Sequence, residues 1–242
     1  LHGRVVGYYA WGARPRVVAG LFLDREEPSL ALPPFRTGTV GRAEAREGQV
    51  LRHELAHHLS AQVLLRQPRW LAEGLAEYLA ATRVGTWQGQ PAAAVGLPAL
   101  DSWAASRVPS AALLAWGADE SGARFYAPSW LLVHWLVNRR GAAFAAYQQR
   151  LARAEDPAAA WKAELPDLDP ADSSAMASLD RELDAYLRSP APRALRVLLP
   201  ATEIPLRLRR MEPPEVHALR AELFLQSLLP PDEAGPRTEA EI

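Results

Sequence analysis

The sequence predicts an α+β protein that is predominantly helical, with a small β-sheet at its N-terminus. Two observations favour this class. Short runs of β-branched and aromatic residues occupy the start of the chain, and from Ala43 onward apolar residues recur at helical spacing. The hydrophobic fraction is 49% of 242 residues, which is ample for a buried core, so the chain should fold as a globular protein.

The first elements are two strands, expected at residues 5–9 and 16–23. The first segment consists mainly of valine and tyrosine and the second is rich in valine, leucine and phenylalanine, and the intervening Gly-Ala-Arg-Pro is typical of a turn. The sheet that leads the chain should therefore contain at least this pair.

Helices are expected to dominate the next part of the chain. Leu51, Leu55, Leu59 and Val63 are spaced four residues apart, and Pro68 ends that helix and starts another at residues 69–82. Residues 85–98, rich in glycine, glutamine and proline, are interpreted as a connecting loop. Further helices are predicted at residues 111–116, 130–138, 142–153 and 178–187, with a loop at residues 119–128.

A change of composition at residues 189–194, SPAPRA, is the candidate domain boundary. It separates a domain at residues 1–190 (β-rich in 1–42, mainly helical in 43–190) from a C-terminal extension at residues 191–242. The extension is expected to hold strands at 195–199 and 204–208 and a helix at 214–228, before a polar tail. That helix is similar to the opening helix of a tetratricopeptide-type array, which would bind a protein partner. A single helix capping the domain is the alternative.

Charge and composition exclude several classes of function. The formal net charge is −1 and the charged fraction is 23%, so the surface is not the basic one that binds nucleic acid. The longest apolar run, at residues 130–137, is interrupted by His134 and far shorter than the ~20 residues of a membrane span. Because the chain has no cysteine, any metal must be bound by histidine and carboxylate side chains.

The segment RHELAH, residues 52–57, carries the clearest functional signal. On a helix, His53 and His57 project from one face one turn apart, close enough to share a metal ion, and Glu54 lies beside them. In such an HExxH motif the glutamate takes a proton from the water that the metal activates, so Glu54 is the candidate general base. Chance alone would place this motif in about one sequence in a hundred of this composition.

A third ligand is expected from the following helix, because a catalytic zinc ion takes three protein ligands and leaves one position for water. Glu73 and Glu77, in WLAEGLAEY, lie one turn apart on a helix that should run antiparallel to the first. On geometry alone, either carboxylate could reach the metal.

The two segments together, HELAH and then WLAEGLAEY, resemble the glutamate-type zinc metallopeptidases, the gluzincins, and above all the bacterial peptidase MA-like domains. The resemblance is close over residues 50–78 and looser to residue 141. It implies a zincin-like fold and one zinc ion per chain, bound by His53, His57 and Glu73. It also implies that Glu77 orients His53, as a ligating imidazole requires an acceptor for its other N–H.

The resemblance also implies a peptide or protein substrate. The interval from His57 to Glu73 is shorter than in the aminopeptidase branch, and the first strands lack a GxMEN-like motif, so an endopeptidase is favoured. Its substrate would pair with an edge strand at residues 16–23. The alternative is a zinc-binding domain without turnover, serving recognition or scaffolding in a larger protein. Because many small zincins act outside the cytoplasm, the resemblance favours a location in the bacterial cell envelope or outside the cell.

Other histidine and aromatic side chains belong to the same predicted helices or to the helix that follows residue 126. Tyr126 precedes a predicted helix, as the transition-state tyrosine does in aminopeptidase-type relatives, and could stabilise an oxyanion; an anchoring role at the rim of the core is the alternative. His58 should point about 100° away from the metal-binding face. His134 is interpreted as a hydrogen-bonded core residue. Trp70 and Tyr78 are expected to pack the second helix against the first, with the floor of a substrate pocket as the alternative for Trp70.

Overall fold

The computed structural model describes residues 7–10, 16–19, 42–95, 108–117, 124–188, 195–200, 209 and 211–228. Its helices are α1 (Arg42–Val63), α2 (Arg69–Ala80), α3 (Ser110–Leu114), α4 (Tyr126–Arg139), α5 (Gly141–Ala152), α6 (Pro157–Glu164), α7 (Ser173–Leu187) and α8 (Pro213–Leu228), with a 3₁₀ helix at Pro166–Leu168. Its strands are β1 (Gly7–Ala10), β2 (Arg16–Ala19), β3 (Arg83–Trp87), β4 (Gln90–Val95) and β5 (Leu195–Leu198). The predicted class, α+β with mostly helices, is confirmed.

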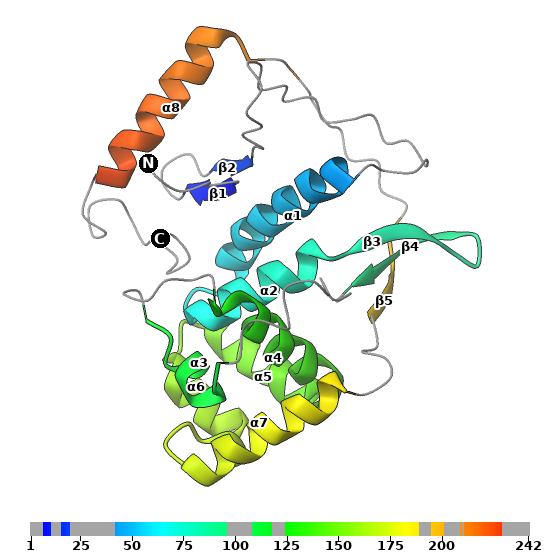
Figure 1. The fold of residues 1–242 in the computed structure, drawn as a ribbon, viewed down its shortest axis with the longest axis vertical. Coiled ribbons are helices and arrows are strands. Elements are labelled where there is room, and N and C mark those ends of the chain that lie inside the picture. Colours follow the sequence, from blue (N-terminus) through cyan, green and yellow to red (C-terminus); the bar gives the residue numbers. More distant parts are fainter. Residues whose placement is uncertain are drawn as a thin grey trace.

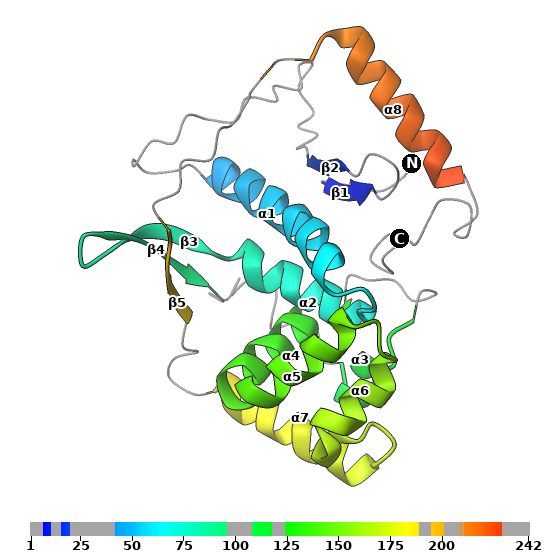
Figure 2. The same cartoon turned by 180° about the vertical axis from the view of Figure 1, so that it is seen from behind.

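Helices α1 and α2 lie in the middle of the molecule (Figures 1 and 2). The antiparallel hairpin β1–β2 packs against α1 on one side, and α8 lies at that same end. Helices α3 to α7 form the other end, where α4 packs directly against α2. Helix α2 is thus covered on two sides, by α1 and by α4, and most of its residues are buried.

A short connection folds α2 back along α1. Pro68 has an extended backbone (φ −70°, ψ 154°), and its carbonyl accepts the backbone N–H groups of Leu71 and Ala72, which starts α2. At the other end of α2, the guanidinium Nε of Arg52 donates to the carbonyl of Ala80 over 2.8 Å. The middle of α1 is therefore fixed to the C-terminus of α2, and the two helices are antiparallel.

Gly74 permits the close approach of α2 and α4. A Cβ atom at this position would lie 2.6 Å from Cγ2 of Val133 and 2.7 Å from the carbonyl oxygen of Ser129. Both distances are shorter than real Cβ contacts, and one of the two atoms belongs to the backbone of α4 and cannot rotate away. A glycine is required here by space, because α4 lies directly on the backbone of α2.

An aromatic cluster anchors the start of α2 in the helical core. The ring of Trp70 stacks on Tyr147 of α5, with centroids 6.4 Å apart, and meets Trp161 of α6 edge-on at 5.5 Å. Tyr78, at the end of α2, lies 5.8 Å from the ring of His134 in α4. The expectation that Trp70 and Tyr78 pack α2 against α1 is therefore wrong. They face the helices on its other side, where apolar surface is available.

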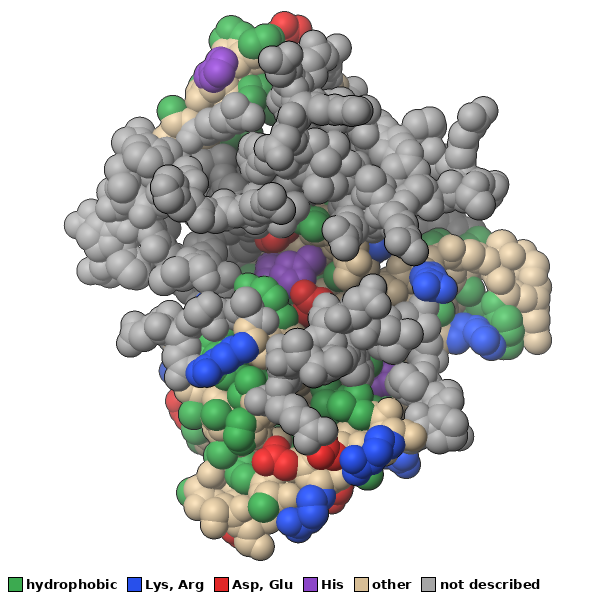
Figure 3. All heavy atoms as spheres, viewed as in Figure 1, with side chains coloured by type: hydrophobic (Ala, Val, Ile, Leu, Met, Phe, Trp, Pro, Cys, Tyr) green, Lys and Arg blue, Asp and Glu red, His purple; other side chains and the backbone are tan. Residues whose placement is uncertain are grey.

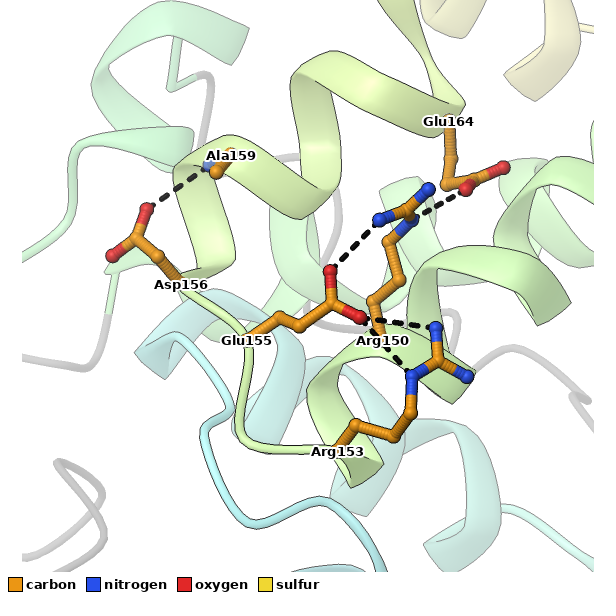
Figure 4. A network of polar contacts seen from close by, with 6 residues as sticks. All are labelled: Arg150, Arg153, Glu155, Asp156, Ala159 and Glu164. Atoms are coloured by element: carbon orange, nitrogen blue, oxygen red, sulfur yellow. Dashed lines mark hydrogen bonds and ion pairs between the residues drawn. The ribbon is translucent and has the colours of Figure 1, made fainter.

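A polar network connects α5 and α6 at the surface (Figure 4). Arg150 pairs with Glu155 and Glu164, and Arg153 also contacts Glu155. Asp156 caps α6 by accepting two backbone N–H groups at its start. The side chains are partly exposed, so these ion pairs contribute little to stability individually.

The region from residue 85 to residue 98, expected to be a loop, begins as a β-hairpin. Strands β3 and β4 pair antiparallel with Trp87 opposite Gln90, so the turn between them has two residues. Both turn residues, Gln88 (φ 52°) and Gly89 (φ 78°), have left-handed backbones, as a type I′ turn requires. The prediction failed because Gln-Gly is a less familiar signal for this turn than Asn-Gly or Asp-Gly.

Strand β5 pairs with β4, in the sheet order β3-β4-β5, and the predicted strand at residues 204–208 lies outside the described residues. The helices differ from the expectation at three points. Helix α4 begins at Tyr126 instead of residue 130, and α7 begins at Ser173, where Asp172 caps it. Helix α6 was not predicted, because its roughly two alanine-rich turns carry little periodicity. In the described part of the chain no helix is long and apolar enough to span a bilayer, as expected.

The substitution Gly74→Ala should destabilise the protein by about 3 kcal/mol, at the upper end of the cost of overpacking, because the new methyl group meets the backbone of α4. Gly141→Ala is the matched control. A Cβ atom there has nothing within 4 Å among the described atoms, and alanine favours a helix, so stability should rise by up to about 1 kcal/mol. Urea unfolding of the two variants measures the difference, and equal effects would contradict the proposed packing role.

Candidate metal centre

Helix α1 places three polar side chains of the HExxH motif at its contact with α2. His57 and Glu54 are buried, with 4% and 7% of their surface exposed, while the side chain of His53 keeps 17%. His53 and His57 lie one helical turn apart, and their rings meet edge-on with centroids 4.7 Å apart. The Nε2 atoms of the two imidazoles are 3.1 Å apart.

Helix α2 adds the carboxylate of Glu73, which is 1% exposed. Its Oε2 atom lies 3.3 Å from Nε2 of His53 and 3.5 Å from Nε2 of His57. Three potential donor atoms from two helices therefore converge on one point. In the described part of the chain, this is the group of side chains that could hold a metal ion.

The three donor atoms fit a zinc ion. Ligands about 2.0–2.1 Å from a tetrahedral zinc ion are about 3.3 Å from one another, close to the separations of 3.1, 3.3 and 3.5 Å found here. The Oε2 atom of Glu73 is buried and has no hydrogen-bond partner among the described residues, although both imidazoles are near. A cation would satisfy this oxygen, whose burial is otherwise costly.

Glu77 lies on the other side of the first histidine. Its Oε1 atom is 3.2 Å from Nδ1 of His53, so this carboxylate can accept the Nδ1–H. With the proton on Nδ1, the lone pair of Nε2 points toward Glu73 and His57. Glu73 thus lies where it can act as a ligand, and Glu77 lies where it can orient His53. The geometry separates the two carboxylates between which helical spacing could not choose.

The two carboxylates shift the protonation of the site. Burial disfavours a charged His53, but the contacts with Glu73 and Glu77 outweigh it and raise the pKa of His53 to about 10. Burial likewise opposes a charged Glu73, but the two imidazoles lower the pKa of Glu73 to about 2. Without a metal, the positive charge is supplied by a proton on His53, which a metal ion must displace.

Glu54 is placed beside the donor group but is not part of it. Burial raises the pKa of this carboxyl group above its usual value, while the charges of His53 and His57 oppose the shift. A carboxylate with a raised pKa accepts a proton more readily at neutral pH, which suits a general base.

Tyr126 lies at the rim of the site, at the first turn of α4. Its ring centroid is 6.2 Å from that of His53, with the two planes inclined by 60°. Burial and the charges of the nearby carboxylates raise the pKa of Tyr126 to about 12. The phenol therefore keeps its proton and can act as a hydrogen-bond donor.

Two further histidines lie outside the donor group. His58 follows His57 in the chain, but its ring is not among the converging atoms. His134 is fully buried in α4, where its Nδ1 atom is 2.7 Å from the hydroxyl of Tyr186 and its ring stacks on Trp130. The interpretation of His134 as a hydrogen-bonded core residue is confirmed.

One side chain near the site was missed. Arg69, the first residue of α2, is 1% exposed; its Nη1 donates to the carbonyl of Gly117 over 2.9 Å, and its guanidinium lies over the ring of Trp116. An arginine after a proline at the start of a helix usually lies in solvent. The signal was absent because Trp116 and Gly117 are distant in sequence.

Comparison of the chain with protein-family models, curated proteins and solved structures found no match.

Replacing any one of the three predicted ligands should abolish zinc binding. Purified without added metal, the parent should contain about one zinc ion per chain, and His57→Asn or Glu73→Gln should contain almost none, because only two donors remain. His58→Asn is the matched control, since this histidine lies outside the donor group and its loss should leave the zinc content unchanged. Elemental analysis gives the stoichiometry. Full zinc retention by Glu73→Gln would exclude Glu73 as a ligand.

Zinc binding should release a proton from His53. Because the pKa of His53 is raised to about 10, the imidazole is charged in the metal-free protein at pH 8, and zinc must displace that proton. Apparent affinity should therefore rise up to about tenfold per pH unit below this pKa. Glu77→Gln removes one of the carboxylates that raise the pKa, so it should release fewer protons.

Calorimetry in buffers of different ionisation enthalpy measures this release. Protons lost from groups other than His53 are common to the parent and to Glu77→Gln, so the difference between them reports on the contact of Glu77 with His53. Equal proton release from the two proteins would contradict this assignment.

Proposed function

We propose that this chain is a zinc-dependent metallopeptidase of the gluzincin type. The observation that carries the proposal is the convergence of His53, His57 and Glu73, whose donor atoms lie 3.1, 3.3 and 3.5 Å apart. Glu54 lies next to this group, in the position that the resemblance to peptidase MA-like domains gives to the general base. The zincin-like fold is part of the same proposal.

The number of donors favours hydrolysis over a purely structural site. Structural zinc sites are closed by four protein ligands, whereas catalytic sites use three and leave a position for water or substrate. The described residues bring three donors together. The site also reaches the surface: 17% of the side chain of His53 is exposed, and Figure 3 shows histidine side chains beside acidic ones near the centre of one face.

Each neighbouring side chain has a distinct task in this proposal. A bound zinc ion would polarise the scissile carbonyl and lower the pKa of a water molecule toward about 7. Glu54 then removes the proton from the attacking water and later delivers it to the leaving amine. Tyr126 donates its O–H to the oxygen of the carbonyl, on which negative charge develops. Glu77 holds the imidazole of His53 in one tautomer and orientation throughout.

Strand β2 supports an endopeptidase that binds an extended substrate. It packs against α1, the helix that carries the HExxH motif, and pairs with β1 on one edge. A peptide added to the other edge would run alongside α1 and would be held by main-chain hydrogen bonds rather than by its ends. The remainder of the predicted edge strand, residues 20–23, lies outside the described residues.

The substitution Glu54→Gln should abolish peptide hydrolysis while zinc stays bound. Glutamine is almost isosteric but cannot take up the proton, and loss of a general base costs about 100- to 10,000-fold in kcat. Glu182→Gln is the matched control, because this glutamate is exposed on α7 and its replacement should change nothing. Cleavage of fluorescently labelled casein, together with zinc content, provides the two readouts.

The outcomes distinguish the two functions considered. Cleavage by the parent and not by Glu54→Gln supports the peptidase. Bound zinc without cleavage of casein or of a mixed peptide library by the parent would favour the zinc-binding module without turnover. Equal cleavage by the parent and Glu54→Gln would refute Glu54 as the base.

A further inference from the structure

A stack of three side chains connects α2 with the first turn of α4. The guanidinium carbon of Arg69 lies 4.4 Å from the centre of the Trp116 ring. On Trp116 stacks the ring of Phe125, with centroids 4.5 Å apart and planes inclined by only 12°. All three side chains are at most 4% exposed. We call Arg69, Trp116 and Phe125 the arginine–aromatic stack.

The stack is attached to α2 at one end and to Tyr126 at the other. Arg69 is the first residue of α2 and also donates to the carbonyl of Gly117, which fixes the segment that carries Trp116. Phe125 directly precedes Tyr126, and the rings of Trp116 and Tyr126 are themselves 6.2 Å apart. Tyr126 in turn lies 6.2 Å from His53.

The start of α4 depends on this packing. No side-chain cap holds the first turn among the described residues: Phe125 occupies the capping position and offers no side-chain acceptor. The position of Tyr126 is thus set by the burial of its neighbour Phe125 against Trp116. A planar guanidinium covers the face of the indole more completely than an ammonium group can, which explains an arginine at position 69.

We propose that Arg69 and Trp116 are positioning residues that hold the hydroxyl of Tyr126 against the substrate carbonyl at the metal centre. This inference rests on the proposed peptidase function and adds a specific route by which residues outside the metal centre control it. A hydrogen-bond donor is effective only within about 2.7–3.1 Å of the developing oxyanion, and a shift of about 1 Å can cost about 100-fold in rate. Rigid stacking of the preceding residue supplies the required precision.

A double-mutant cycle between Arg69 and Tyr126 tests the proposal. The zinc-loaded parent, Arg69→Met, Tyr126→Phe and the double variant are titrated with a phosphinic peptide, whose tetrahedral oxygens resemble the transition state. Tyr126→Phe should weaken binding by about 10- to 100-fold. Arg69→Met should weaken it about tenfold, since it displaces the same donor. The double variant should bind within about twofold of Tyr126→Phe, because nothing remains to be positioned.

Controls separate positioning from general destabilisation. Arg150→Met removes a partly buried arginine whose two ion pairs, with Glu155 and Glu164, do not involve the stack, and should leave the affinity unchanged. Arg69→Lys keeps the charge and should recover only part of the affinity, because the planar stacking is lost. If Arg69→Met does not fold, Trp116→Phe takes its place in the cycle, with a smaller effect in the same direction. Zinc content and thermal unfolding are measured for every variant.

The experiment distinguishes a failure of the positioning role from a failure of the proposed peptidase function. Effects of Arg69→Met and Tyr126→Phe that multiply in the double variant would overturn the positioning role while leaving the peptidase intact. Loss of zinc from Arg69→Met would also overturn it, since the residue would then support the ligands instead. A parent that binds neither zinc nor the phosphinic peptide would overturn the proposed function and this inference together.

Discussion

The site depends on the close contact between α2 and α4 at Gly74. Because α4 lies directly on the backbone of α2, the carboxylate of the preceding residue, Glu73, is buried at the contact between α2 and α1. The same approach brings the first turn of α4, with Tyr126, beside His53. One missing Cβ atom thus allows three helices to meet at the candidate metal centre. The glycine of the WLAEGLAEY segment has a steric role, and the glutamate before it has a chemical one.

The burial of the donor group gives the centre its chemical character. Charged side chains inside a protein must be compensated, and here the imidazole of His53 lies between the carboxylates of Glu73 and Glu77. In the proposed zinc site, a proton and the metal ion would compete for the same lone pair of His53. The protein is stable enough to keep these polar groups together because the remainder of α2 is fixed by apolar contacts with α4, α5 and α6.

Local signals in the sequence predicted the candidate site more accurately than they predicted the fold. The spacing of His53, Glu54 and His57 on a helix, and the restart of a helix at Pro68, are properties of short segments, so these parts agree with the structure. Helical spacing could not decide whether Glu73 or Glu77 is the third donor, because that depends on the distances from each carboxylate to the imidazoles of α1. The hairpin at residues 83–95 was missed because its turn signal is uncommon, and Arg69 because its partner Trp116 is brought to it only by folding.

The compact spacing of the donors along the chain has a thermodynamic consequence. All three come from the stretch between His53 and Glu73, so a metal ion closes a short loop whose ends are already held by the contact of Arg52 with Ala80. In the proposed zinc site, the ion would therefore hold together one helical hairpin. The aromatic core joins Trp70, which lies within that loop, to Tyr147 and Trp161 on helices outside it, and owes its cohesion to apolar burial. Removal of the metal would then loosen the contact between α1 and α2 at the donor group, while the helices α3 to α7 stayed folded.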